Sequence, residues 1–136
     1  MAKYLTILLI FCSLLANAQV KRALSFINDS EYERAQSALE KGLGKDSSDP
    51  GLLYCYSLLL IQPDYLNYNL GESYLKIRSS IDSYKLLDME SKIELAEDGV
   101  DSAAIYSLKE KLDLMGLEKA REGNRIPKPG CIFFVF

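Results

Sequence analysis

The chain has 136 residues, of which 49% are hydrophobic and 26% charged, with a formal net charge of −3 and no histidine. The absence of histidine excludes histidine-based catalytic triads and removes the commonest metal ligand. Lys and Arg are interspersed with Asp and Glu, without the basic cluster that neutralises nucleic-acid phosphates. The composition therefore disfavours nucleic-acid binding, and the length suits one domain with a modest core.

The N-terminal segment 1–18 is predicted to be a signal peptide. Lys3 gives a positive start, residues 5–16 form an apolar run, and Ala16-Asn17-Ala18 fits a small-x-small cleavage site. The run is shorter than the ~20 apolar residues that a membrane-spanning helix needs. We therefore expect an exported protein, periplasmic or associated with the cell envelope, that begins at Gln19 and has no membrane span after cleavage. A buried helix or an uncleaved anchor is the alternative.

Two cysteines, Cys55 and Cys131, remain after cleavage. An exported chain could join them in a disulfide. However, Cys55 falls in an apolar helix and Cys131 in an irregular tail, which favours a buried core thiol for Cys55. Two cysteines without histidine do not make an ordinary zinc site. No nucleophile–base pair is visible, so we expect no catalytic residue, no metal and no cofactor.

Helices are predicted along nearly all of the remaining chain. The first covers about 20–29, and residues 30–33 fit a capping box in which Ser30 opens a second helix. Gly44 is expected to end that helix in a left-handed turn. Asp49 caps a third helix with Pro50 at its first position, and this helix is apolar on most sides.

Three further helices are predicted in the second half, each opened by a polar cap. Asn69 begins a helix that runs to about Leu87, Asp88 begins a short helix that Gly99 ends, and Asp101 begins a longer helix that ends near Gly123. The last helix carries one apolar stripe at spacings of three and four, which consists of Ile105, Leu108, Leu112 and Met115. Residues 125–136 fit no helix, and a short terminal strand is the alternative to an irregular apolar tail.

A hydrophobic spacing recurs in the first half of the chain. One set returns 34 positions later, as Leu24, Phe26 and Ile27 become Leu58, Leu60 and Ile61. A second set returns 38 positions later, as Ala35, Leu39, Gly42 and Leu43 become Ser73, Ile77, Ser80 and Ile81. A period of about 34 residues with two helices per unit is typical of helical repeat arrays, which usually act as binding scaffolds.

These residues resemble the tetratricopeptide repeat (TPR) family. The clearest match is 30–50, where Ala35 takes the small position of the second helix, Leu39 the bulky position, and Gly42-Leu43 the small-then-large pair. Asp49-Pro50 stands for the closing proline, displaced by a few residues.

The resemblance covers about residues 20–87 and departs from the family in places. Ala23 and Ser57 take the small position of the first helices, but the Trp-x-x-Leu-Gly motif is absent and serines replace alanines in the second unit. The layout is also similar to exported repeat proteins of Bacteroidetes-type bacteria, through Asn17-Ala18-Gln19 and the insertion Pro63-Asp64-Tyr65.

The resemblance implies an all-α fold in which antiparallel helix pairs stack as a short TPR-like right-handed solenoid. The expected organisation is a signal peptide at 1–18, two helix pairs at 19–87, a linker helix and a capping or partial-repeat helix at 88–124, and an irregular apolar tail at 125–136.

The function implied by the resemblance is a non-catalytic protein–protein interaction scaffold in the cell envelope, with a protein or peptide as its partner. In the family the first helix of each pair lines the inner face, which implies a peptide groove at Leu24, Tyr54, Leu58 and Ile61. Interhelical packing is the alternative role for these residues and for the many tyrosines.

Two other functions remain open. One is a truncated accessory N-terminal module of a larger exported protein, whose activity lies in a missing downstream domain. A fragment or a shifted reading frame would also explain the apolar tail. The other is a carrier of an apolar ligand in a tyrosine-rich pocket.

Overall fold

A computed structural model describes the backbone of residues 2–125 and the side chains of residues 3–7 and 19–121. All regular structure within this part of the chain is α-helical, which confirms the all-α part of the predicted fold class. The helices are α1 (Ala2–Asn28), α2 (Tyr32–Lys45), α3 (Pro50–Leu60), α4 (Leu70–Lys85), α5 (Met89–Glu97) and α6 (Ser102–Arg125). The predicted tail beyond Arg125 lies outside the described residues.

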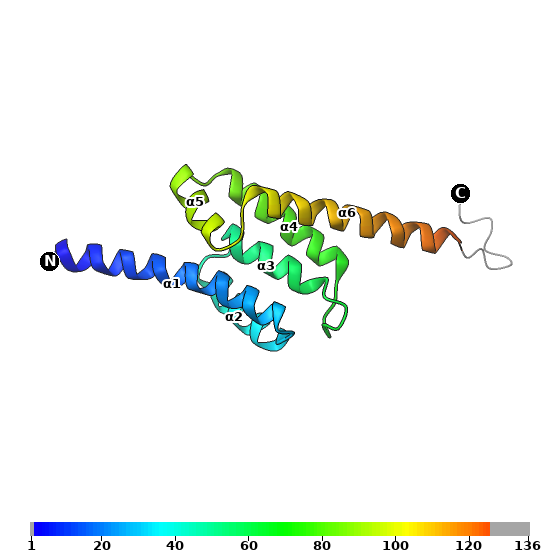
Figure 1. The fold of residues 1–136 in the computed structure, drawn as a ribbon, viewed down its shortest axis with the longest axis horizontal. Helices are drawn as coiled ribbons and strands as arrows, with labels where there is room; N and C mark the ends of the chain where they lie inside the picture. The colour runs from blue at the N-terminus through cyan, green and yellow to red at the C-terminus, as the bar shows by residue number, and fades with distance from the viewer. Residues whose placement is uncertain (1, 126–136) are drawn as a thin grey trace.

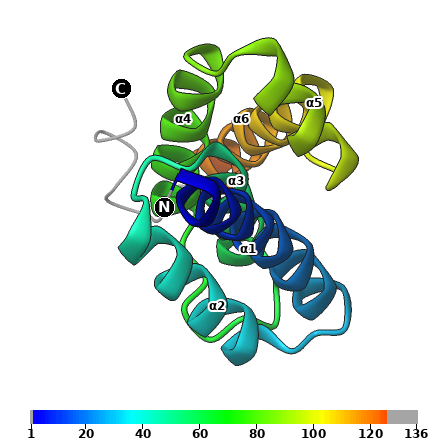
Figure 2. The same cartoon turned by 90° about the vertical axis from the view of Figure 1, so that its left-hand side faces the viewer.

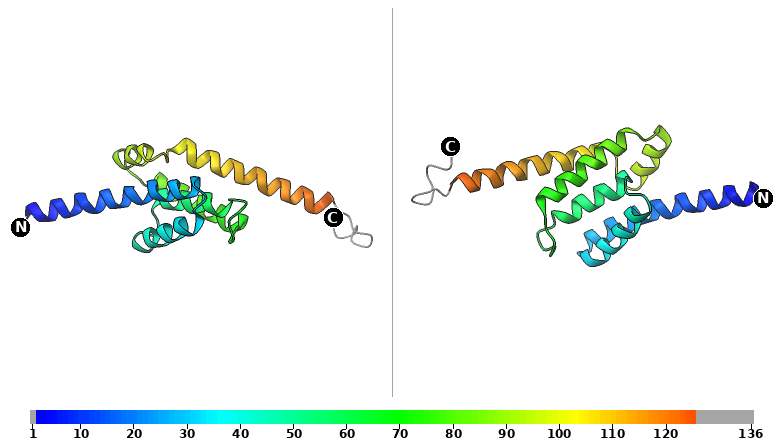
Figure 3. Two further views of the ribbon diagram at one scale, coloured as in Figure 1. Left: turned by 60° about the horizontal axis from the view of Figure 1, so that its bottom comes forward. Right: turned by 180° about the vertical axis from the view of Figure 1, so that it is seen from behind.

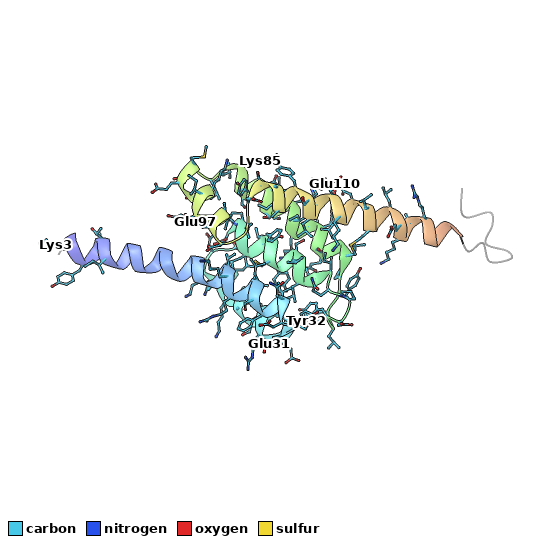
Figure 4. The ribbon with its side chains drawn as sticks, in the orientation of Figure 1. Lys3, Glu31, Tyr32, Lys85, Glu97 and Glu110 are labelled. Carbon is cyan, nitrogen blue, oxygen red and sulfur yellow. The ribbon has the colours of Figure 1, made fainter. Side chains whose placement is uncertain are left out.

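The helix α1 is longer than the sequence predicted, because one continuous helix covers both the expected signal peptide and the expected first helix. Its N-terminal part, which carries Lys3, projects from the body of the molecule (Figures 1 and 4). The first buried side chain described in this helix is Val20, two positions after the expected cleavage site. Within the described residues, no helix combines the length and the apolar character that a membrane crossing requires.

Most of the predicted helix starts are confirmed by hydrogen bonds from free backbone amides to the capping side chain. Asp49 accepts from the amides of Gly51 and Leu52 at 2.9 and 3.2 Å, with Pro50 in the first turn. The other three caps accept from single amides at 2.7–3.0 Å, and they are Asn69, Asp88 and Asp101.

Two predicted helix boundaries are wrong. Ser30 does not cap α2: the capping position belongs to Glu31, whose side chain makes no capping bond. Ser30 instead has a φ of 61° and closes α1, since its own amide donates to Ile27 and the next amide donates to Phe26. This is a Schellman motif with serine at the left-handed position, where glycine is more usual.

Gly44 does not end α2 in a left-handed turn, because the helix continues to Lys45 and Gly44 lacks a positive φ. The corresponding prediction for α5 is confirmed. Gly99 has a φ of 94°, its amide donates to Ala96, and the amide of Val100 donates to Leu95.

The helices pack in an order that follows the chain. The closest packing is between α1 and α2, α2 and α3, α1 and α3, α3 and α4, and α4 and α6. Figure 2 shows α3 between the α1/α2 pair and α4. Consistent with this position, most of α3 is buried, as its apolar sequence predicted.

The core contains the positions that recur along the sequence. Leu39 in α2 and Ile77 in α4 are fully buried, as are the small residues Ala35 and Ser73 one turn earlier. The first half of α6 completes the core with Ile105, Leu108 and Leu112, while Met115 packs against its edge. The second half of α6 extends beyond the body, on the opposite side from the projecting part of α1 (Figure 3).

Candidate binding surface

The residues predicted to line a groove lie on α1, α3 and the residue that follows α3. Leu24, Tyr54 and Leu58 are half-buried and pack against the core. Ile61 is only 5% exposed and belongs to the core itself. Because α1 and α3 pack together, the three half-buried side chains lie on adjacent helices.

The connection between α5 and α6 covers one end of this region. Leu24 Cδ1 lies 3.9 Å from the position that a Cβ would take on Gly99. Burial raises the pKa of Tyr54, and the neighbouring Cys55 and Asp101 add smaller electrostatic contributions in the same direction. The phenol therefore stays neutral near pH 7.

Two contacts hold α5 and its connection in place. Lys21 Nζ lies 3.4 Å from Asp98 Oδ1, and the Asp98 side chain is only 5% exposed. The other carboxylate oxygen of Asp98 has no hydrogen-bond partner among the described residues. At Gly51, a Cβ would lie 2.6 Å from Leu95 Cδ1, so the absence of a side chain there allows α5 to approach the start of α3.

The tyrosines mainly serve packing between elements. Tyr65 donates to Gln36 Oε1 at 2.6 Å across the α2 and α3–α4 segments. Tyr32 meets Tyr65 edge to face, with ring centroids 6.0 Å apart. Lys76 lies over the ring of Tyr56 at 5.3 Å. These contacts give Tyr32, Tyr56 and Tyr65 structural partners, in line with the packing alternative, whereas Tyr68 and Tyr106 are exposed.

The chemistry of the described residues is that of a packed core. Cys55 is fully buried, and burial raises the pKa of its thiol far above the ordinary value, which makes it a poor nucleophile and confirms the core-thiol prediction. Cys131 lies outside the described residues. Within them, no group of three or more His, Cys, Asp or Glu side chains is placed to hold a metal ion.

A surface that the sequence analysis missed lies between the start of α4 and the middle of α6. It is a hollow of about 690 Å³, called here the α4/α6 hollow, and its lining residues are Leu70, Gly71, Tyr74, Leu112, Asp113, Gly116, Leu117 and Lys119. The available signal was Leu117, which lies outside the single apolar stripe assigned to this helix. A second apolar direction on one helix indicates a second packing face.

A more polar hollow of about 580 Å³ lies between the α1–α2 turn and the α3–α4 loop. Glu31 and Tyr32 mark this end of the molecule in Figure 4. The hollow has mixed charge, because Glu33 and Asp64 also line it together with Arg34, which lies 3.4 Å from Glu31. It adds no catalytic grouping to the described part of the molecule.

In comparisons with known proteins, no family model, no curated protein and no solved structure matches this chain.

Proposed function

We propose that the protein is a non-catalytic protein–protein interaction scaffold of the tetratricopeptide repeat type. The observation that carries this proposal is the packing order, in which the pair α1/α2 is followed by the pair α3/α4 and α3 contacts both helices of the first pair. The small residues Ala35 and Ser73 are fully buried at equivalent positions of the two pairs. Successive helix pairs that contact only their neighbours form the extended binding surfaces of repeat proteins.

The proposed binding face is the adjacent surface of α1 and α3. Leu24, Tyr54 and Leu58 present partly exposed apolar area on rigid helices, and Tyr54 adds a neutral hydroxyl. Large side chains that are held rigid lose little entropy on binding and often dominate the affinity of an interface. Since the α5–α6 connection borders Leu24 and Tyr54, the partner peptide would make its main contact at Leu58 and the exposed side of Tyr54.

We place the protein in the cell envelope, exported by a signal peptide that is cleaved after Ala18. The support is that Tyr4, Leu5 and Ile7 are exposed on the projecting part of α1, while Val20 is the first buried side chain among those that the structure describes. Removal of segment 1–18 would therefore leave the described core contacts in place. N-terminal sequencing of the exported protein should yield Gln19.

The test of binding is site-specific photo-crosslinking in cells that express the full chain. A photoreactive phenylalanine analogue at position 58 should yield a discrete protein adduct, because a bound peptide would lie within reach of this side chain. The matched control is the same analogue in place of Tyr106, a residue of α6 that is 47% exposed. A further Tyr54→Ala change should reduce the adduct at position 58 severalfold.

The proposed face is wrong if positions 58 and 106 give the same adducts, or if position 58 gives none in a chain that shows normal helical content. Equal adducts would indicate random collision with abundant proteins. An adduct from position 58 that persists with Tyr54→Ala would show that a partner contacts this part of α3 but does not use Tyr54 as an anchor.

A second candidate is an accessory module that packs against another domain of a larger exported protein. The observation that favours it is the apolar surface of α6, where Leu114 and Leu117 are 57% and 55% exposed. In that case a photoreactive residue at position 114 of the larger protein would crosslink to that domain, and position 58 would capture none.

A further inference from the structure

The α4/α6 hollow has a glycine at its centre. Gly116 lies in the middle of residues 112–119, the part of α6 that lines the hollow. A Cβ added at Gly116 would meet no other described residue within 4 Å. Glycine is among the least favourable residues in a helix interior. Packing within the described part of the chain does not account for glycine here, whereas the close approach of a segment from another molecule would.

The charged residues of the hollow are arranged symmetrically about this glycine. Asp113 lies three residues before Gly116 and Lys119 three residues after it, and both line the hollow. At the rise of an α-helix, each lies about 4.5 Å along the axis from Gly116. Asp113 pairs with Lys109 at 3.0 Å, and its carboxylate can accept further bonds. The ion pairs found among the described residues do not include Lys119.

We propose that the α4/α6 hollow binds the α6 helix of a second copy of this chain, packed antiparallel about a two-fold axis that passes beside Gly116. This arrangement places Asp113 of each copy at the level of Lys119 of the other copy, so one contact surface forms two equivalent ion pairs. A parallel pair in the same register would instead place identical charges side by side. The glycine lets the two helix backbones approach closely at the axis.

The apolar lining of the hollow would gain cover from the second copy. Leu117 is 55% exposed, and Leu70 and Tyr74 of α4 are half-buried. The second half of α6 extends beyond the body, where another molecule can pack along it (Figures 1 and 3). Burial of these side chains in both copies would add a hydrophobic contribution to the two ion pairs.

The expected dimer is weak and depends on concentration and salt. A contact made mainly by a few turns of one helix is smaller than the ~1,600 Å² of a standard stable interface. Its ion pairs lie near the surface, so added salt should screen them. The dimer uses no residue of the proposed partner-binding face on α1 and α3. Either proposal can therefore fail without the other.

A charge exchange between two variants of the full chain tests the proposal by sedimentation equilibrium. Asp113→Lys or Lys119→Asp alone gives a dimer like charges at both contacts, so each should self-associate at least about tenfold more weakly than the parent chain. An equimolar mixture should regain the parent's affinity, because the new lysine of one variant meets the new aspartate of the other and the unchanged pair also meets. The control is Glu118→Lys, which is exposed on α6 outside the hollow and should leave association unchanged.

A second change tests the close approach at the axis. Gly116→Leu should abolish the dimer but keep the helical content, since the added side chain has open space within its own chain. Gly44→Leu is the control, because Gly44 of α2 has equally open surroundings but lies outside the hollow. A parent chain that stays monomeric would overturn the proposal. So would association that Gly116→Leu leaves unchanged, or a mixture of the two charge variants that associates no better than either variant alone.

Discussion

The two helix pairs of this protein bury the same positions with different chemistry. The first pair buries Ala23 and Ala35, which have no polar side-chain atoms. The second pair buries Ser57 and Ser73 at the equivalent positions of its two helices. Each of these hydroxyls lies within hydrogen-bond distance of the other residue's carbonyl oxygen, at 2.8 Å from Ser57 Oγ and 2.7 Å from Ser73 Oγ.

The difference shows how a repeated helix crossing tolerates serine in place of alanine. A buried hydroxyl without a partner destabilises a fold, and here each hydroxyl donates to a backbone carbonyl of the facing helix. Paired serines satisfy each other through backbone carbonyls that retain a free lone pair within the helix. The same solution recurs at Ser80, which corresponds to Gly42 and donates to the carbonyl of Pro50 at 2.7 Å.

The largest expected effect comes from the bulky core residues that both pairs share. Leu39→Ala in α2 and Ile77→Ala in α4 should each lower the free energy of unfolding by about 2–5 kcal/mol, because both side chains are fully buried. Urea unfolding monitored by circular dichroism measures the loss. Leu75→Ala is the control, since Leu75 lies on α4 but is 62% exposed. If one core variant behaved like this control, the two pairs would not be equivalent in stability.

A smaller effect is expected from the serine pair. Ser57→Ala or Ser73→Ala alone should cost about 0.5–1.5 kcal/mol, since each removes one buried hydrogen bond. The double variant gives the second pair the chemistry of the first, and it should cost less than the sum of the single changes, because the two Oγ atoms also lie 2.9 Å apart. A double-mutant cycle from urea unfolding measures this coupling.

The control for the serine cycle is Ser79→Ala at an exposed position of α4, which should change stability little or raise it slightly, because alanine favours helix. Additive losses at positions 57 and 73 would contradict the view that the two serines act as one unit.

The smallest effect concerns the aspartates that join each pair to the next element. Burial raises the pKa of Asp49, which links the first pair to α3, despite the opposing hydrogen bonds from Leu52 and Gly51. Hydrogen bonds with Ser91 lower the pKa of Asp88, which links the second pair to α5. In a carbon-13 NMR titration of the carboxyl groups, Asp49 should titrate above 3.8 and Asp88 below it.

The two aspartates therefore contribute to the pH dependence of stability with opposite signs. Asp49 binds its proton more tightly in the folded state, so its contribution to stability increases as the pH falls through its raised pKa toward 3.8. Asp88 binds its proton less tightly in the folded state, so its contribution is present above 3.8 and is lost as the pH falls through its lowered pKa. The reverse order of titration would mean that the start of α3 is open to water.

Much of the local structure could be predicted because it depends on neighbours in sequence. Asp49-Pro50, Asn69 and Asp88 begin helices through bonds to amides two or three residues away. The wrong predictions at Ser30 and Gly44 also concern local structure. At Ser30, the end of one helix and the start of the next compete for the same residue. Ser30 closes α1 rather than opening α2, and the capping-box pattern does not distinguish the end of one helix from the start of the next.

The candidate binding face was only partly predictable. The resemblance implied a groove at Leu24, Tyr54, Leu58 and Ile61. The first three are half-buried on α1 and α3, whereas Ile61 belongs to the core. The coverage by the α5–α6 connection depends on the Lys21–Asp98 pair and on the contact of Leu95 at Gly51. The partners in each contact lie far apart along the chain, and no repeat or local pattern relates them.

The sequence by itself determined that the chain is helical, where most of its helices begin, and which stripes face the core, because capping and periodicity are local properties. Only the tertiary structure decided that Ser57 and Ser73 share hydrogen bonds, that the α5–α6 connection covers one end of the α1/α3 surface, and that α4 and α6 together line a hollow. The physical reason is that a side chain's partners and its exposure depend on segments distant in sequence, whose approach is set by the packing of the whole core.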